Sequence, residues 1–255
     1  TCLCTGSGAT AGLNRIARVF RDFRPEKDVA FVSLMEHHSN DLPHRKHASE
    51  VIHIPLDNHT GNQPGCMNLE ALEEKLHEYQ NRINYVAVTG VSNVTGIINP
   101  VHEIAKLAHQ YGALILIDGA QMAAHLPVQL SGHDDPDCDI DAFVFSGHKT
   151  YVPGSPGVVV CRQDILKDIE PEEVGGGMVD DVYVDRYIVK DYFPDREEAG
   201  TPNIPGAIAL ATALEVLERI GMDYILEDET ILIENALERM KHIPDIVIYG
   251  ETDCN

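Results

Sequence analysis

Short apolar runs and longer amphipathic stretches alternate along the chain. Runs of β-branched, aromatic and aliphatic residues occupy 28–34, 85–89, 113–117, 142–145 and 158–160, and we expect strands there. The run at 113–117 is almost continuously apolar, as is typical of a strand that is covered on both faces. These runs indicate a sheet with a buried centre.

Helical spacing fills several of the stretches between these runs. Leucines spaced for one helix face predict a helix over 68–80. Pro100 opens a second helix, which Gly112 ends. From 204 to 240 the pattern is again helical, with an interruption near Gly221. Strands that alternate with helices of this size predict an α/β fold with a mainly parallel central sheet flanked by helices.

Two parts of the chain lack this alternation. The Gly- and Asp-rich stretch 175–191 is expected to be an irregular loop. The chain begins at Thr1 within strand-like residues and stops soon after a strand-like run at 246–249. Both ends therefore look cut.

Charge and cysteine usage narrow the function classes. The chain has 41 acidic and 19 basic residues and a formal net charge of -22, which repels nucleic-acid phosphates and anionic lipid headgroups. Six scattered cysteines without C-x-x-C spacing disfavour a disulfide scaffold or a structural zinc site. No apolar run has the length of a membrane span. We expect a cytoplasmic protein without nucleic acid or membrane as a partner.

Polar, chemistry-bearing segments follow five of the expected strands. In parallel α/β sheets, ligands bind at the carboxyl ends of strands. One such end would be ordinary, but five on one edge predict a single site. The segments are TGSGAT at 5–10, EHHSN at 36–40, SNVTG at 92–96, DGAQ at 118–121 and SGHK at 146–149.

The residue types in these segments suit pyridoxal 5′-phosphate (PLP). The amine of Lys149 can form a Schiff base with an aldehyde. Asp118, directly after a buried strand, can pair with a protonated ring nitrogen and keep PLP an electron sink. A histidine can stack on the ring, and Gly-rich turns with hydroxyl groups can hold the phosphate.

The ordered segments EHHSN, SNVTG, DGAQ and SGHK resemble those of class V aminotransferase-type PLP enzymes. Within that group they are most similar to the SufS-type cysteine desulfurases and selenocysteine lyases. EAGTPN at 198–203 is similar to another stretch of the family, and the resemblance runs from about Thr5 to Tyr249. It implies a fold type I PLP-binding large domain, N-terminally truncated, over 1–225, and the truncated start of a small C-terminal domain over 226–255.

The resemblance also implies catalytic roles. Lys149 would bind PLP covalently and later move protons on the substrate. Asp118 would face the pyridine nitrogen, and His37 would stack on the ring. Gln121 would donate to the phenolic oxygen, and Asn93 would contact the ring-side hydroxyl or the substrate carboxylate region.

A second set of residues would hold the cofactor phosphate. The resemblance assigns this role to the Ala9 backbone, Thr10, Ser146 and His148. Thr201 would reach the phosphate of a neighbouring subunit, which makes a homodimer the expected functional unit.

The implied activity is removal of sulfur or selenium from L-cysteine or selenocysteine to give alanine, with a possible sulfur-acceptor protein. A C–S lyase, an isopenicillin-N-type epimerase and an aminotransferase stay open on the same scaffold, as does a catalytically incomplete PLP-binding fragment. In the desulfurases, the sulfur-accepting cysteine and the carboxylate-binding arginine lie beyond the point where this chain stops. Cys254 does not have the context of that cysteine.

Two other ligand classes fit the residues less well. The four histidines between 37 and 47 could form a metal cluster, but their spacing matches no common zinc pattern, and we predict no metal. The glycines at 6–11 superficially fit a dinucleotide fingerprint. That fingerprint needs an acidic residue that ends a strand, whereas Asp28 opens one.

Overall fold

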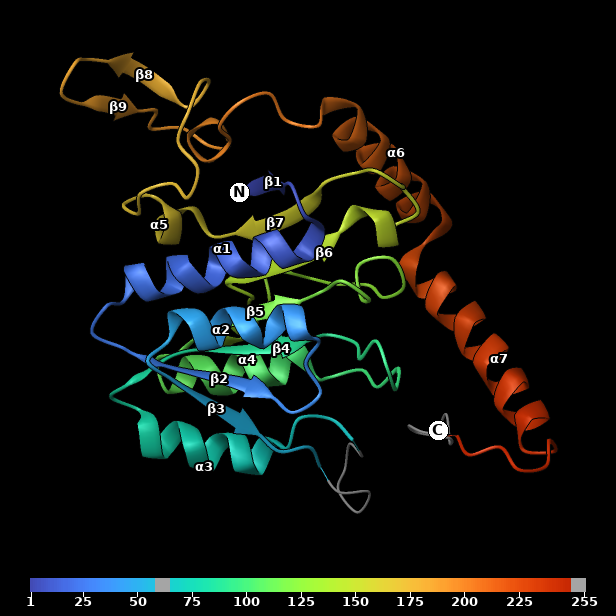
Figure 1. The fold of residues 1–255 in the computed structure, drawn as a ribbon. Helices are drawn as coiled ribbons and strands as arrows, with labels where there is room; N and C mark the ends of the chain where they lie inside the picture. The colour runs from blue at the N-terminus through green and yellow to red at the C-terminus, as the bar shows by residue number, and fades with distance from the viewer. Residues whose placement is uncertain (58–64, 249–255) are drawn as a thin grey trace.

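The computed structural model describes residues 1–57 and 65–248, and a seven-stranded sheet lies at its centre (Figure 1). The strands lie in the order β1-β7-β6-β5-β4-β2-β3. The pairings that join β6, β5, β4, β2 and β3 are parallel, and β7 and β1 add antiparallel pairings at one edge. The mainly parallel sheet predicted from the sequence is confirmed. Its strands are β1 (Cys2–Thr5), β2 (Val29–Ser33), β3 (Glu50–Ile54), β4 (Ile83–Thr89), β5 (Leu114–Asp118), β6 (Ala142–Ser146) and β7 (Gly157–Cys161).

Helices cover both faces of this sheet, so its strands are apolar on both sides. In β4, Val86 and Val88 pack with α3 and α4, whereas Tyr85 and Ala87 pack with α1 on the other face, because successive side chains of a strand point to opposite faces. The helices are α1 (Gly8–Phe23), α2 (Leu42–His47), α3 (Leu69–Tyr79), α4 (Val101–Gln110), α5 (Gln163–Leu166), α6 (Ile204–Ile220) and α7 (Met222–Met240), with the 3₁₀ helices η1 (His38–Asn40), η2 (Pro136–Cys138), η3 (Gly147–Lys149) and η4 (Asp195–Glu197).

Local sequence signals set the helix ends. The Asn68 side chain accepts a hydrogen bond from Ala71 N at 2.8 Å and caps α3. Gly112, with φ +69°, ends α4 in the left-handed conformation that glycine adopts readily. Gly221, with φ +96°, separates α6 from α7. The predicted helices over 68–80, from Pro100 to Gly112 and from 204 to 240 are confirmed.

Two predicted elements are wrong. Within 175–191, β8 (Val179–Val182) and β9 (Tyr187–Val189) form an antiparallel hairpin, which projects from the body in Figure 1. Tyr183 N donates to Arg186 O at 2.8 Å across its turn. The β-branched and aromatic residues of this stretch outweigh its glycines and aspartates.

The predicted strand at 246–249 is also corrected. Residues 246–248 form no strand, because a strand forms only where a neighbouring strand pairs with it, and none pairs with these residues in the described part of the chain. Tyr249 lies outside the described residues. The expected boundary between residues 225 and 226 falls inside α7 and stays a prediction.

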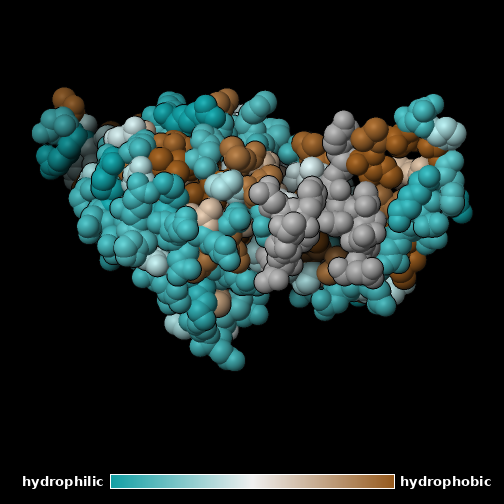
Figure 2. Space-filling model, turned by 90° about the horizontal axis from the view of Figure 1, so that it is seen from below, coloured by the Kyte–Doolittle hydropathy of each residue, from teal (hydrophilic) through white to brown (hydrophobic). Residues whose placement is uncertain are grey.

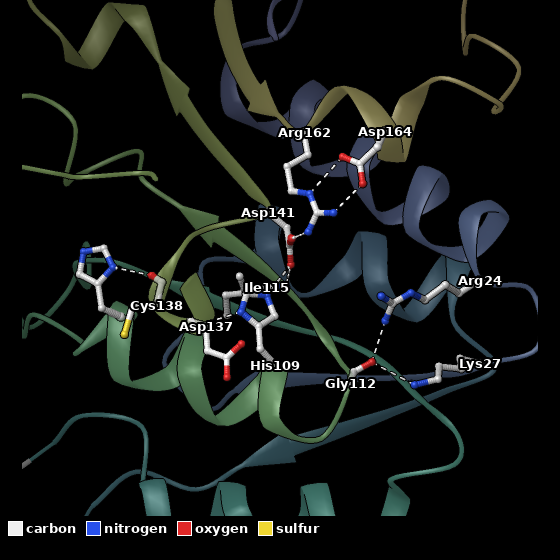
Figure 3. Close-up of polar contacts among 11 residues, drawn as sticks. Arg24, Lys27, His109, Gly112, Ile115, Asp137, Cys138, Asp141, Arg162 and Asp164 are labelled. Atoms are coloured by element: carbon white, nitrogen blue, oxygen red, sulfur yellow. Dashed lines mark hydrogen bonds and ion pairs between the residues drawn. The ribbon is translucent and has the colours of Figure 1, made fainter. Parts of the chain in front are cut away.

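Asp141, directly before β6, links neighbouring elements at the amino-terminal ends of the central strands (Figure 3). The buried Asp141 carboxylate accepts hydrogen bonds from Ile115 N at 2.9 Å, His109 Nε2 at 2.9 Å and Arg162 Nη1 at 2.7 Å. These donors come from β5, from α4 and from the residue after β7. The start of β6 is therefore fixed, and its other end leads directly to Lys149.

Two further features bear on the predictions from composition. Among residues 1–57 and 65–248, no helix is long and apolar enough to cross a membrane. The five cysteines of the same residues are free thiols.

Candidate cofactor site

A cavity of about 270 Å³ lies at the carboxyl ends of the strands. The segments after β1, β2, β4, β5 and β6 all contribute to its wall, so the expected convergence of five strand ends is found in the structure. The predicted site residues on this wall are Ala9, Thr10, His37, Asn93, Asp118, Gln121, Ser146, His148 and Lys149.

The N-terminus of α1 forms one side of the cavity. The helix begins at Gly8, three residues before the apolar pattern that starts at Ala11. Ala9 N donates to Ser146 Oγ at 2.7 Å, and Thr10 Oγ1 lies 2.8 Å from Ser39 Oγ. A helix N-terminus with backbone N–H groups and hydroxyl groups beside it favours an anion.

Two glycines make this arrangement possible. Gly8 has φ +60°, and a Cβ atom there would lie 2.9 Å from Ser146 Oγ. A Cβ atom at Gly157, at the start of β7, would lie 2.2 Å from the carbonyl oxygen of Gly8. A side chain at either position would displace the loop that carries the helix N-terminus.

Asp118 places a buried carboxyl group at the floor of the cavity. It ends β5 and is 4% exposed. In the described part of the chain, the hydrogen bond that its carboxylate accepts comes from Ala120 N at 3.0 Å. Burial raises the pKa of Asp118, and the hydrogen bond from Ala120 and the nearby Lys149 and His37 partly oppose this.

Lys149 faces the same cavity from η3, directly after β6. The η3 turn is closed by Thr150 N, which donates to Gly147 O at 2.9 Å. Within the described ranges, no carboxylate lies within ion-pair distance of the Lys149 amine. Lys149 thus lines the cavity without an ion-pair partner among residues 1–57 and 65–248.

The histidines that follow β2 lie in different environments. His37 lies on the cavity wall, whereas His38 does not. Ser39 N donates to His37 Nδ1 at 3.0 Å and fixes the ring. His44 is buried and bonded to Tyr85 OH at 2.9 Å. Residues 1–57 and 65–248 contain no cluster of three or more side chains suited to hold a metal ion.

Thr201 lies apart from these residues. It is exposed and lines a separate cavity of about 230 Å³ with Cys4, Arg15 and Glu198. A larger cavity of about 340 Å³ lies between α6 and the sheet, and apolar side chains line it except for Glu218. Sequence reasoning missed five residues of the cofactor-site cavity: Ser7, Ser39, Thr89, Val91 and Ala120. Ser39 belongs to EHHSN and Thr89 ends β4, so their positions already signalled the site.

Comparison with known proteins identifies the family of this chain. A model of the family described as aminotransferase class-V matches residues 5–255. The chain belongs to the aminotransferase class-V family. The cysteine desulfurase of Shigella sonnei (strain Ss046) is 37% identical over 248 residues, which are 95% of this chain and 58% of that relative. This chain therefore spans about 58% of the length of that curated relative.

Two solved structures share the fold of this class V chain. The crystal structure of the cysteine desulfurase CsdA from Escherichia coli matches with a TM-score of 0.81 at 29% identity, over 95% of this chain and 58% of that chain. The apo structure of a cysteine desulfurase from Thermococcus onnurineus NA1 gives a TM-score of 0.80 at 30% identity, over 99% and 60%. The predicted fold type I architecture is confirmed.

Proposed function

We propose that this chain forms the PLP-binding part of a cysteine desulfurase-like enzyme, which removes sulfur from L-cysteine, or selenium from selenocysteine, and releases alanine. The carrying observation is that Lys149, the buried Asp118 and the N-terminus of α1 line one cavity. Relatives named cysteine desulfurase support the reaction class. The donor set in the cavity fits PLP at both of the cofactor's polar ends.

At the phosphate end, a helix N-terminus meets hydroxyl groups. Thr10 Oγ1 and Ser146 Oγ would donate to phosphate oxygens beside the Ala9 backbone, whose N–H group donates to Ser146 Oγ and orients it, and His148 lies on the same wall. Gly8 leaves the space that this cradle needs, because a Cβ atom there would meet Ser146 Oγ. The positive end of the helix macrodipole adds to the attraction.

At the ring end, Asp118 would hold a proton on the pyridine nitrogen, His37 would stack on one ring face, and Gln121 would donate to the phenolic oxygen. When bound, PLP draws electrons from the α carbon of the substrate. An ionised Asp118 suits this chemistry, and a bound cation at the ring nitrogen would offset the effect of burial on its pKa. Asn93 would contact the ring-side hydroxyl or the substrate carboxylate.

Lys149 has two tasks in this proposal. Its amine would hold the cofactor covalently and, once the substrate amine takes that place, would move protons on the substrate. A cysteine thiolate of the enzyme would then take the substrate sulfur as a persulfide, which leaves alanine. No residue of this chain is assigned to that thiolate or to the arginine that binds the substrate carboxylate.

The proposal includes a homodimer, a sulfur-acceptor protein and a cytoplasmic setting. Thr201 is exposed and far enough from the cofactor-site cavity to line a different one, which supports a role for it in a neighbouring subunit. The free thiols of the described cysteines support a reducing compartment.

The test is product analysis with the protein at its natural full length, PLP and L-cysteine. We expect alanine and persulfide sulfur in equal amounts, and the Lys149→Ala variant should lower the rate by about 10²–10⁴-fold, the usual contribution of a general acid–base residue. Pyruvate with ammonia and sulfide would assign a C–S lyase instead. No product from L-cysteine or selenocysteine would refute the desulfurase reaction.

A further inference from the structure

Glu36, a residue that the proposed chemistry does not use, joins three structural elements beside the cofactor-site cavity. Thr89 N, at the end of β4, donates to Glu36 Oε1 at 3.0 Å, and Asn40 Nδ2, in η1, donates to Glu36 Oε2 at 2.6 Å. Ser33 Oγ, at the end of β2, also donates to Glu36 Oε1. The carboxyl group of Glu36 therefore accepts hydrogen bonds from all three elements.

A chain of hydrogen bonds runs from Tyr85 through His44 and Asn40 to Glu36, and each residue donates to the next. Because the Asn40 amide donates to Glu36, its carbonyl oxygen accepts from His44 Nε2 at 3.1 Å. Burial lowers the pKa of His44 to about 3, so the ring is neutral at pH 7. Neutral His44 then accepts at Nδ1 from the Tyr85 hydroxyl at 2.9 Å. Glu36, the acceptor at the end, sets the direction of the network.

The loop that contacts Glu36 carries His37 and Ser39, and both residues line the cofactor-site cavity. Asn40 N donates to His37 O at 2.7 Å, and Ser39 N donates to His37 Nδ1 at 3.0 Å. Ser39 Oγ in turn lies 2.8 Å from Thr10 Oγ1 at the N-terminus of α1. Movement of Glu36 would therefore reach both the stacking histidine and the phosphate side of the cavity.

We propose that Glu36 is a positioning residue for the cofactor site, which holds His37 and Ser39 on the cavity wall as the acceptor end of the Asn40–His44–Tyr85 network. The inference rests on the proposed function for its link to PLP, whereas the network consists of this chain's own residues. Glu36 touches neither substrate nor cofactor in this assignment, so it acts through His37 and Ser39.

The charge state of Glu36 offers a readout without cofactor. Part of Glu36 remains accessible, but burial of its carboxyl group raises its pKa to about 8; the donors Ser33, Asn40 and Thr89 oppose this, and the charge of Asp118 adds to it. The pKa of a glutamate in the unfolded chain is about 4.3. The folded chain thus keeps one extra proton on Glu36 between about pH 4.3 and 8, which the carboxyl group shares with the Ser33 hydroxyl while its two oxygens still accept from Thr89 N and Asn40 Nδ2. Stability falls as pH rises through this window.

The decisive variants change the hydrogen-bond direction and leave the size of the side chains alone. In E36Q, the amide N–H group must face one of two donors, Thr89 N or Asn40 Nδ2. In the double variant E36Q/N40D, the amide of residue 36 can donate to the new carboxylate at position 40, which can still accept from His44. The swap restores a donor and an acceptor at each contact.

In the protein at its natural full length, E36Q should bind PLP about tenfold more weakly, a loss of about 1.4 kcal/mol, because it leaves a buried donor unmatched. E36Q/N40D should return to within about threefold of the wild type, which is less than 1 kcal/mol. D139N is the matched control, because it changes a carboxylate that also accepts three hydrogen bonds, in the loop before β6 and away from the cofactor-site cavity. It should leave PLP affinity within about twofold of the wild type.

The apo protein separates this inference from the proposed function. The ¹⁵N NMR signal of His37 Nδ1 should shift in E36Q and return in E36Q/N40D, and the one-proton slope of stability between about pH 4.3 and 8 should disappear in E36Q. If E36Q and E36Q/N40D show these His37 changes but the wild-type protein binds no PLP, the proposed function is wrong and the positioning role is supported. An unchanged His37 signal in E36Q, or no recovery in the double variant, would overturn the positioning role.

Discussion

Gly8 has a positive φ and lies against Ser146, one of the residues proposed to hold the phosphate. G8A would place a Cβ atom 2.9 Å from Ser146 Oγ at φ +60°, so we expect about tenfold weaker PLP binding, given about 1–3 kcal/mol of strain for such a residue. G132A is the matched control, since Gly132 also has a positive φ, +84°, and its added Cβ atom would meet only Gln129 Nε2, at 4.0 Å. Equal PLP affinities of G8A and G132A, measured by equilibrium dialysis, would contradict the cradle.

Asp118 should show opposite effects on stability and on cofactor binding. Burial raises its pKa, so its contribution to apo-protein stability is full below the ordinary pKa of an aspartate and is lost as pH rises through the raised value. D118N should therefore raise the melting temperature of the apo protein at pH 7. It should also weaken PLP binding about ten- to hundredfold, because a charged hydrogen bond is lost. Tighter or equal PLP binding would argue against the ring-nitrogen role.

Lys149 and Asp118 could be placed on the cavity wall in advance, because Asp118 follows an apolar run directly and Lys149 ends the segment SGHK that follows another. The choice of His37 over His38 could not be made from strand position, since both follow β2. It depends on the loop conformation in which Ser39 N donates to His37 Nδ1. Glu36 gave no sequence signal of its role, because its partners Thr89 and Asn40 come from two different elements.

Among the elements, β6 depends on the Asp141 anchor at its start. His109 Nδ1 faces Asp137 O and its Nε2 faces Asp141 Oδ2, so both ring nitrogens donate only if the ring is protonated. Burial opposes that state, but the hydrogen bond and charge of Asp141 outweigh it and raise the pKa of His109.

The stabilising contribution of His109 is therefore full below about pH 6.5, the ordinary pKa of histidine, and is lost as pH rises through the raised value. H109Q should cost about 1–3 kcal/mol at low pH and less as pH rises. Urea unfolding measures the difference in the free energy of unfolding between the wild type and H109Q. The series should run from about pH 5.5 to 9, which spans the ordinary pKa of histidine. A difference independent of pH would show that the ring is not charged in the folded state.

Elements buried on both faces were the most predictable. The continuous apolar runs of β4 and β5 identify them, whereas β3 is only partly buried at the sheet edge and mixes polar with apolar residues. The first turn of α1 gave little signal in the sequence, because apolar spacing identifies the packed face of a helix and says little about its first turn. That turn is fixed by Gly8 and by the bond from Ala9 N to Ser146.

On the whole molecule, apolar surface gathers on the side where α7 lies (Figure 2). Ile231, Leu232 and Ile233 of this helix are exposed, and exposed apolar patches promote association. We expect the 255-residue chain to self-associate as its concentration rises, and L232E to reduce this, with E238Q as a control on the same helix. Light scattering after size exclusion measures the mass. Identical masses for the wild type and L232E would contradict a role for this surface.

Lys149 is the residue that we propose binds PLP covalently in the cavity formed by the strand ends. The most direct measurement is the visible absorption spectrum of the full-length protein with PLP, before and after borohydride, followed by peptide mapping. We expect a band of bound cofactor that borohydride removes, with PLP fixed to the peptide that contains Lys149. A spectrum of free PLP only, or a label on another lysine, would show that Lys149 does not have this role.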